Sequence, residues 1–247
     1  MTGILSATLV VLLVGANSSA PAVEGQDEAA VRQAALDYIE GWFEGDAARL
    51  EPVLHPNFVK RIAAVTVAGD DFFLPEDRDG MLARARAGGD KATPQDKREI
   101  RVRVLDLART TAAVRVDSTY YVEYLSLVRL RGHWQVVNVL WENVPNDKTA
   151  IPLAPEALAP YAGEYRSAKG RAIQIAVEGS RIFLLWPGEP RIEVFPESES
   201  EFFTKGYKSG LRFVRDPAGG VLQMVYHANY RSVAFERVRS PETSPPK

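Results

Sequence analysis

The sequence contains no cysteine, and this absence removes several kinds of chemistry at once. Disulfide bonds, thiolate nucleophiles, thiolate metal sites and a lipid-modified N-terminal cysteine are all excluded. Histidine is scarce as well: His55, His133 and His227 are isolated, and none belongs to a closely spaced metal-binding motif. We therefore expect neither a metal ion nor a cofactor, and we expect His55, next to Pro56, to pack at a corner of the chain.

The sequence also lacks an excess of charge of either sign. It has 30 Lys and Arg residues against 32 Asp and Glu residues, so nothing favours binding to a nucleic acid. A glycine-rich phosphate loop, a nucleophile elbow and Ser-His-Asp spacing are absent too. The acidic cluster from Asp70 to Asp79 has no calcium-loop spacing, and acids at a helix N-terminus explain most of it. Alternating arginines such as Arg101 and Arg103 indicate the solvent face of strands.

No hydrophobic run is long enough to cross a membrane comfortably. Residues 4–14, ILSATLVVLLV, are apolar but fall short of the roughly 20 residues that a spanning helix needs. Ala20-Pro21-Ala22 follows and offers the small-x-small pattern of a signal peptidase site. The segment predicts a signal peptide over residues 1–22 and a secreted or periplasmic protein without stable membrane insertion. The alternative is an uncleaved anchor, because the basic residues that usually precede the apolar run are missing.

One amphipathic helix is the clearest element that the sequence does contain. Residues 28–45, EAAVRQAALDYIEGWFEG, return apolar side chains to one face at helical spacing. We expect a polar lead over 23–27, with Asp27 as the N-cap. Gly45 and Asp46 predict the end of this helix and the start of the next, because Gly accepts a left-handed conformation and Asp supplies a capping oxygen.

The chain up to residue 144 alternates helical and strand patterns. A second helix is expected from Asp46 to Leu54, where His55-Pro56 stops it, and a third over 74–88, with Pro75 in its first turn. Strands are expected over 58–67, 100–107, 110–117, 120–131 and 134–141. Helices on one face of an antiparallel sheet define an α+β domain.

These residues resemble the nuclear transport factor 2-like superfamily, and within it the branch named putative lumazine-binding. The similarity rests on the helix that ends in Gly45-Asp46, the corner His55-Pro56-Asn57-Phe58 and the final strands in RGHWQVVNVLW, residues 131–141. The resemblance implies a cone of curved antiparallel sheet wrapped around three helices over residues 27–144, with a cavity at its open end.

The rest of the chain has a different composition and a different hydrophobic pattern. Residues 145–160 are rich in proline and predict a linker, and the tail 240–247 predicts disorder. Between them, over 161–239, eight short β-favouring runs argue for a small barrel or sandwich: 163–166, 172–177, 182–186, 192–195, 202–205, 211–214, 221–226 and 232–238.

This second half resembles the lipocalin-like β domain that follows the catalytic domain of serine β-lactamase-related hydrolases. The motifs that carry the similarity are YAGEY at 161–165, Pro187-Gly188, Phe195-Pro196, Phe202-Phe203 and LRFVRD at 211–216. No Ser-x-x-Lys motif of a catalytic domain precedes it in this sequence. Hydrolase activity is therefore not implied.

The candidate chemistry centres on the first helix. Tyr38 lies where the resemblance to ketosteroid isomerases implies a pocket tyrosine, but the expected carboxylate base is missing from Lys60-Arg61-Ile62-Ala63. Without that base, packing in the core is the simpler role for Tyr38. Strand alternation puts Tyr121 and Glu123 on one face. The predicted pocket residues are Tyr38, Trp42, Phe58, Tyr121, Glu123 and Trp141.

Three functional hypotheses follow. The first is an exported, non-catalytic or accessory protein whose cone binds a small apolar or aromatic ligand, or forms a homodimer through its sheet. The second is an isomerase, dehydratase or hydrolase that uses the same cavity, with Tyr38 paired with Glu123 or His55. The third makes the β domain a protein-interaction module of the cell envelope, with the cone as its scaffold.

Overall fold

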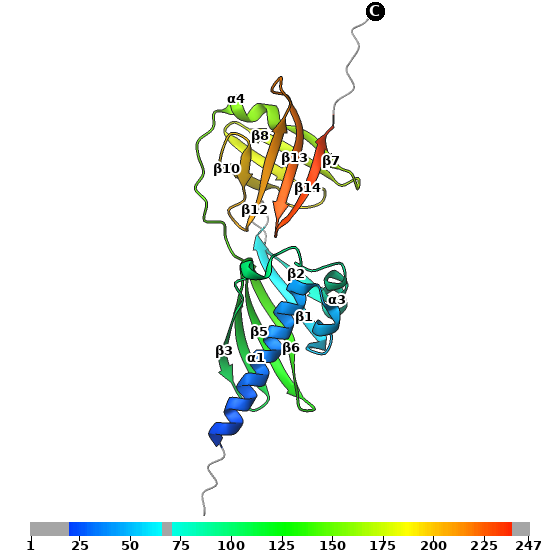
Figure 1. Cartoon of the computed structure of the whole chain (residues 1–247). Coiled ribbons are helices and arrows are strands. Elements are labelled where there is room, and N and C mark those ends of the chain that lie inside the picture. Colours follow the sequence, from blue (N-terminus) through cyan, green and yellow to red (C-terminus); the bar gives the residue numbers. More distant parts are fainter. Residues whose placement is uncertain (1–19, 66–70, 239–247) are drawn as a thin grey trace, which may run out of the picture.

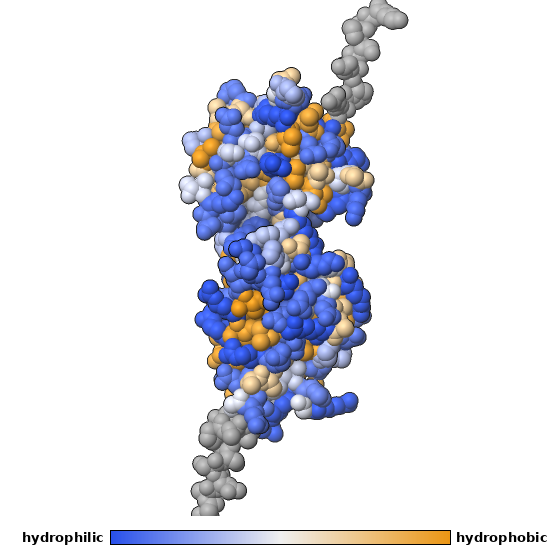
Figure 2. Space-filling view, viewed as in Figure 1, coloured by the Kyte–Doolittle hydropathy of each residue, from blue (hydrophilic) through white to orange (hydrophobic). Residues whose placement is uncertain are grey.

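The computed structural model describes residues 20–65 and 71–238, which form two domains with separate hydrophobic cores (Figure 1). Most of the predicted signal segment, the predicted tail and Asp70 lie outside the described residues. None of the described helices has the length and apolar character that crossing a bilayer requires. On the face shown in Figure 2, hydrophilic residues dominate, with a patch of hydrophobic residues on the N-terminal domain.

Helix α1, Ala20–Glu44, crosses the concave face of the N-terminal sheet (Figure 1). It begins well before the predicted start, and Asp27 is not its cap: the Asp27 carboxylate accepts a 2.5 Å hydrogen bond from Arg129. The expected apolar stripe is buried, namely Val31, Ala35, Tyr38, Ile39, Trp42 and Phe43. A helix with this stripe stabilises the domain by covering the sheet rather than by its intrinsic propensity.

The predicted junction after α1 is confirmed. Gly45 adopts a φ of 66°, and the Asp46 amide donates to the Gly41 carbonyl at 2.8 Å. Asp46 then caps α2, Ala47–Leu50, by accepting from the amides of Ala48 and Arg49. Helix α2 is shorter than predicted, because the chain turns after Leu50 and enters strand β1 before His55-Pro56.

The N-terminal sheet contains six described strands in the order β2-β1-β6-β5-β4-β3. Their bounds are β1 Leu54–Val65, β2 Asp71–Asp77, β3 Arg101–Leu107, β4 Thr111–Asp117, β5 Tyr121–Leu130 and β6 His133–Asn143. Strands β1 and β6 run parallel, so the prediction of a wholly antiparallel sheet is wrong at this pair. Strand order is set by contacts between distant segments, and no local pattern reveals it.

Strand β2 lies partly where the third helix was predicted. The Leu74-Pro75-Glu76-Asp77 segment pairs with β1, and helix α3, Arg78–Arg86, starts only after Asp77, which caps it through the Gly80 amide at 2.8 Å. Because β2 is an edge strand, Pro75 can occupy it without removing a needed hydrogen bond. A 3-10 turn, η1 Gln95–Lys97, completes the described helical elements of this domain.

The C-terminal domain is a closed barrel in which all eight predicted strands are present. They are β7 Gly163–Ser167, β8 Ala172–Glu178, β9 Arg181–Leu185, β10 Ile192–Pro196, β11 Glu201–Phe203, β12 Ser209–Arg215, β13 Val221–Ala228 and β14 Arg231–Arg237. Inward positions such as Ile175, Phe213 and Phe235 fill its core.

The predicted linker contains more structure than its composition indicates. Helix α4, Pro155–Leu158, and the 3-10 turn η2, Ala159–Tyr161, close one end of the barrel with the buried side chains of Leu158 and Tyr161. Earlier in the linker, the amides of Asn146 and Ile151 donate to the carbonyls of Lys205 and Pro196 at 2.9 Å each. The segment therefore follows the barrel surface instead of spanning free space.

Candidate functional site

Three polar side chains meet inside the cone, from α1, β1 and β5. The Tyr38 hydroxyl donates to Glu123 Oε1 at 2.8 Å, and Lys60 Nζ lies 2.6 Å from the same oxygen and 3.1 Å from the Tyr38 hydroxyl. Glu123 and Tyr38 are completely buried, and Lys60 is 6% exposed. Strand alternation explains the arrangement, because Phe58, Lys60 and Glu123 all point to the concave face that α1 covers.

The electrostatics of this cluster keep the tyrosine protonated. Burial raises the pKa of Tyr38 well above its ordinary value, and the negative charge of Glu123 raises it further. Glu123 is therefore the proton acceptor and Tyr38 the donor. Lys60 supplies the compensating charge that a buried carboxylate requires.

One oxygen of the cluster remains without a partner. Glu123 Oε2 is buried and accepts no hydrogen bond from the residues that the structure describes, whereas Oε1 has two partners. Buried carboxylate oxygens rarely stay unsatisfied, because losing water without a replacement donor costs about 1–3 kcal/mol or more. Glu123 Oε2 is therefore the atom of this cluster that lacks a hydrogen-bond donor.

Aromatic rings surround the ammonium group of Lys60. Its Nζ lies 4.8 Å from the ring centroid of Trp141, and the rings of Tyr121, Tyr38 and Trp42 follow at 5.5, 5.7 and 5.9 Å. Tyr121 and Trp141 meet edge to face at 5.3 Å. Faces of aromatic rings attract cations, so this cage stabilises the charge on Lys60 away from water.

A second carboxylate, that of Asp90, forms hydrogen bonds with two side chains of this cage. Asp90 is 4% exposed and accepts hydrogen bonds from Trp42 Nε1 at 2.9 Å and from the Tyr121 hydroxyl at 2.6 Å. Asn229 of the barrel donates to Asp90 at 3.1 Å and to the Tyr121 hydroxyl at 2.8 Å. Burial and the charge of Asp90 raise the pKa of Tyr121 well above its ordinary value.

The structure brings the predicted pocket residues together around Lys60. Five of them face the ammonium group or pair with it, while Phe58 is an apolar neighbour whose ring lies 6.4 Å from that of Tyr38. His55 is not part of the cluster; it lies within β1 and not at a corner of the chain, and its Nδ1 accepts from the Asn57 amide at 3.0 Å. That these residues bind a ligand stays a prediction.

Two central residues were missed by the sequence reasoning. Lys60 was noted only as a departure from an acidic position, although alternation from the apolar Phe58 to Ile62 marks it as inward-facing. The sequence predicts no role for Asp90. Only the pair Gly88-Gly89 before it indicated a tightly packed backbone, and a Cβ on Gly89 would lie 2.0 Å from the Trp42 carbonyl oxygen.

The acidic cluster near β2 is divided among structural roles. Asp77 caps α3, and Glu76 lies opposite Lys60 in the β1–β2 register and pairs with Arg84 at 3.3 Å. Arg84 in turn covers the Trp42 ring at 5.1 Å. Within residues 20–65 and 71–238, no group of three or more His, Asp or Glu residues is placed to hold a metal ion.

Comparison with known families supports the assignment of the N-terminal domain. Residues 26–142 match the model of a family described as "Putative lumazine-binding". This match confirms the predicted resemblance of the N-terminal half to the putative lumazine-binding family.

Similar solved structures include proteins described as nuclear transport factor 2-like and of unknown function from Silicibacter pomeroyi DSS-3 and Shewanella baltica OS155. They are 16% and 17% identical, cover 49% of this chain each and 98% and 97% of their own, and both have TM-scores of 0.40. A nuclear transport factor 2-like protein with a cystatin-like fold from Novosphingobium aromaticivorans is 15% identical over 52% of this chain and 88% of its own, with a TM-score of 0.37.

One curated relative is larger than this chain. "Penicillin-binding protein 4*" of Bacillus subtilis (strain 168) is 32% identical over 69 residues, which make up 28% of this chain and 15% of that protein. The match therefore spans less than a sixth of that relative's length. The predicted resemblance of the barrel to the β domain of serine β-lactamase-related hydrolases stays a prediction.

Proposed function

We propose that the N-terminal domain binds a small, flat ligand that donates an N–H or O–H group to Glu123 at the open end of the cone. The observation that carries this proposal is the buried, unpartnered Oε2 of Glu123. Lys60 and Tyr38 both contact the other oxygen, so neither satisfies it. A ligand donor would recover the hydrogen bond that this oxygen lacks.

Along the concave face, exposure of the side chains increases with distance from this carboxylate. In the sheet register Glu123 lies beside Trp141, then Ile62, then Leu74. Trp141 and Ile62 are half-buried and Leu74 is 61% exposed. Pockets for small molecules combine such apolar and aromatic walls with a few polar groups. The description of the matching family, lumazine binding, names a ligand of this flat, hydrogen-bonding kind.

Isothermal titration calorimetry with lumazine, riboflavin, uracil and guanine tests this proposal. We expect at least one to bind the full-length protein with a dissociation constant below about 1 mM, and E123Q or W141A to weaken it at least about tenfold. E142Q and L140A alter neighbouring side chains of β6 that are exposed, and both should bind as the parent does. The proposal is refuted if no probe binds, or if E123Q and W141A bind as tightly as their controls.

An acid–base enzyme is the second candidate, because Tyr38 and Glu123 meet at hydrogen-bond distance. In this mechanism Glu123 accepts a proton from a bound substrate, and Lys60 stabilises the negative charge that the substrate then carries. The reaction would be an isomerisation, dehydration or hydrolysis. Solvent deuterium incorporation into cyclic ketones, followed by NMR, tests the proton-abstraction step; equal rates with E123Q and the parent protein would exclude Glu123 as the base.

Export and the predicted domain limits, 27–144 and 161–239, belong to the same proposal. The apolar segment at 4–14 and the Ala20-Pro21-Ala22 pattern support cleavage after Ala22. Mass spectrometry of the protein recovered from periplasm or culture fluid should find Val23 at its N-terminus. An intact Met1 in that fraction would contradict cleavage, and confinement to the cytoplasm would contradict export.

A homodimer through the N-terminal sheet is also proposed. Leu140 and Tyr124 lie side by side on the face opposite α1 and are 45% and 42% exposed. Apolar side chains gathered on an open sheet face are typical of contact surfaces. Sedimentation velocity should show a dimer that L140D dissociates; a monomer in the parent protein would refute this part.

The barrel is proposed as an envelope-interaction module in the third hypothesis. The match of 69 residues to a protein named for penicillin binding supports this proposal. Pull-down from envelope extracts with each half of the chain separates the contributions. Capture by the N-terminal half alone would overturn this role for the barrel.

A further inference from the structure

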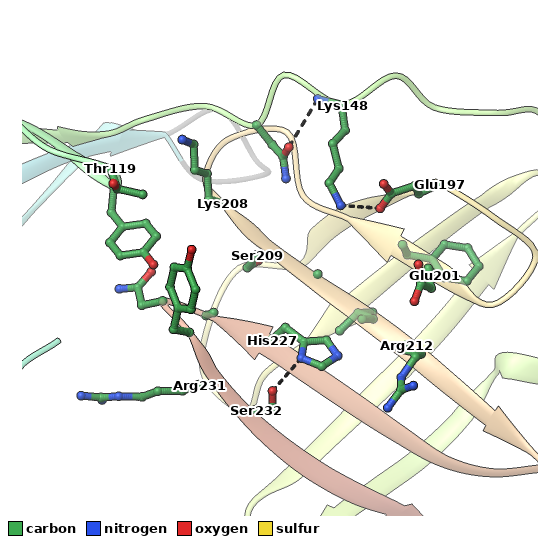
Figure 3. A pocket seen from close by; sticks show the side chains of 18 of the residues that line it. Thr119, Lys148, Glu197, Glu201, Lys208, Ser209, Arg212, His227, Arg231 and Ser232 are labelled. Carbon is green, nitrogen blue, oxygen red and sulfur yellow. Dashed lines mark hydrogen bonds and ion pairs between the residues drawn. The ribbon is translucent and has the colours of Figure 1, made fainter. Parts of the chain in front are cut away.

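A cleft of about 750 Å³ lies between the two domains (Figure 3). Its walls come from the β4–β5 turn with Thr119 and Tyr120, from the linker at residues 146–148, and from the outer face of barrel strands β11 to β14. Its volume falls within the range of small-molecule sites, which occur often between domains. Because both domains contribute walls, the cleft belongs to the whole chain and is distinct from the cone site.

The walls of the cleft are held by hydrogen bonds across the domain boundary. Beside the contacts of Asn229 with Asp90 and Tyr121, Arg231 donates to the carbonyls of Gly88 and Gly89. On the other side Lys148 of the linker pairs with Glu197 of the barrel. The cleft is thus formed before any ligand arrives, which reduces the entropy lost on binding.

The floor of the cleft is cationic. Lys208 comes just before β12 and Arg212 lies on it, two residues to either side of Gly210, where a Cβ would lie 2.7 Å from the Phe202 carbonyl oxygen. No ion pair to Lys208 or Arg212 is found among the described residues. The acids near them are Glu201, opposite Arg212 in the β11–β12 register, and the exposed Asp147 of the linker. Glu197, by contrast, is already neutralised by Lys148.

A histidine and a serine extend this floor toward β14. His227 lies opposite Gly210 and Ser232 opposite His227, and the His227 Nδ1 and the Ser232 hydroxyl are 2.8 Å apart (Figure 3). Burial lowers the pKa of His227, and the positive charge of Arg212 lowers it further. The ring is therefore neutral at neutral pH. In the tautomer in which Ser232 donates to Nδ1, Nε2 carries the proton and is a hydrogen-bond donor.

Tyr230 stands at the edge of the cleft in a strained conformation. Asn229 and Tyr230 form the two-residue turn between β13 and β14, with φ values of 47° and 57°. Hairpin turns of this kind favour Asn followed by Gly, because a bulky residue is strained at positive φ. Tyr230 is 55% exposed and gains no burial that would explain the strain. Strain retained in this way is typical of functional positions.

We infer that the interdomain cleft binds a small organic anion whose carboxylate or phosphate lies over Gly210 between Lys208 and Arg212, with its apolar body against Tyr120 and Tyr230. Lys208 and Arg212 supply charge-assisted hydrogen bonds, and His227 supplies a neutral donor between them. The inference is independent of the function proposed for the cone.

Calorimetric titration of the full-length protein with 4-hydroxybenzoate and phenyl phosphate tests the inference and separates the two anion sources; inorganic phosphate probes the anion alone. We expect one of the two organic anions to bind more tightly than inorganic phosphate. The K208Q/R212Q variant should lose at least about tenfold in affinity, because two charge-assisted hydrogen bonds disappear. K169Q/R166Q, which removes two exposed charges elsewhere on the barrel, should bind as the parent does.

Tyr230→Gly separates a binding role from a structural one. Glycine suits the turn, so we expect the melting temperature of this variant to stay the same or rise while its affinity for the organic anion falls. E123Q should leave anion binding unchanged, which keeps this result apart from that for the cone site. Absence of binding by both organic probes at about 1 mM, equal binding by K208Q/R212Q and its control, or full affinity in Tyr230→Gly would each overturn the inference.

Discussion

The ion pair between Lys60 and Glu123 allows a quantitative test of how the cone is built. At 2.6 Å and an effective dielectric constant of about 20, Coulomb's law gives an attraction of about 6 kcal/mol. Each charge loses several kcal/mol of hydration on burial, so the pair as a whole stabilises the domain little. Removing one partner is different, since it leaves the other charge buried and alone. We expect Lys60→Met to lower the free energy of unfolding by about 3–5 kcal/mol.

The double variant K60M/E123L should recover most of this loss. Replacing both partners with apolar side chains of similar size removes both hydration costs, and such replacements are often neutral or stabilising. The Tyr38 hydroxyl then loses its acceptor, which costs about 1–3 kcal/mol. We therefore expect the double variant to lie between Lys60→Met and the parent. The coupling energy of the full cycle, with Glu123→Leu as its other arm, should be about 3 kcal/mol or more.

Urea unfolding followed by tryptophan fluorescence measures these values for the N-terminal domain. Three of the four tryptophans, Trp42, Trp134 and Trp141, lie in the N-terminal core or pack against it, and Trp186 packs in the barrel. A W186F background therefore restricts the signal to the domain of interest, which matters because two domains need not unfold in one transition. The reasoning is refuted if Lys60→Met costs less than about 1 kcal/mol, or if the coupling energy is near zero.

Three further predictions concern the packing between elements. Gly89→Ala should destabilise the protein by about 2–4 kcal/mol in thermal melts, because its Cβ would collide with the Trp42 carbonyl oxygen at a positive φ; an unchanged melting temperature would contradict this contact. Asn229→Gly keeps the turn but removes the side-chain hydrogen bonds from Asn229 to the N-terminal domain. Calorimetry should therefore show the unfolding transitions of the two domains moving apart. Coincident transitions would exclude a stabilising coupling of the domains through Asn229. Hydrogen bonds from Arg115 lower the pKa of Asp117, so the folded state gains stability above the ordinary pKa of about 4 and loses it as the pH falls through the lower folded value. Asp117→Asn should flatten this acid limb in pH-dependent urea unfolding, and an identical limb would refute the assignment.

The barrel illustrates what sequence patterns predict well. Its eight strands follow period-two alternation and are separated by Gly, Pro, Asp or Ser clusters, so each element can be recognised from its own residues. In the N-terminal domain the same logic placed Tyr121 and Glu123 on one face of their strand, and the structure shows that this face is the concave one. Helix α1 was recognised from its apolar stripe and its Gly45-Asp46 ending. Each of these features depends on interactions within a few residues.

The misassigned elements depend on neighbours that are distant in the chain. The segment around Pro75 has every signal of a helix start, yet it pairs with β1 because an edge of the sheet is available there. The parallel pairing of β1 with β6 is likewise decided by the whole sheet. For the site, Tyr38 and Glu123 were predictable as a facing pair. The roles of Lys60 and Asp90 were not, because they depend on contacts with side chains from other strands and from the barrel.

The contact of Asn229 with Tyr121 links the two proposed sites. Tyr121 lies in the cage around Lys60, and its hydroxyl accepts from the turn that also carries Tyr230 at the edge of the cleft. A ligand that repositions Tyr121 in the cone must therefore change the hydrogen bonds of this turn. By thermodynamic linkage, the factor by which an anion in the cleft changes the affinity of the cone for its ligand equals the factor by which that ligand changes the affinity of the cleft for the anion. Asn229→Gly removes the shared hydrogen bond, so it should leave both sites able to bind but reduce the factor by which each ligand affects the other.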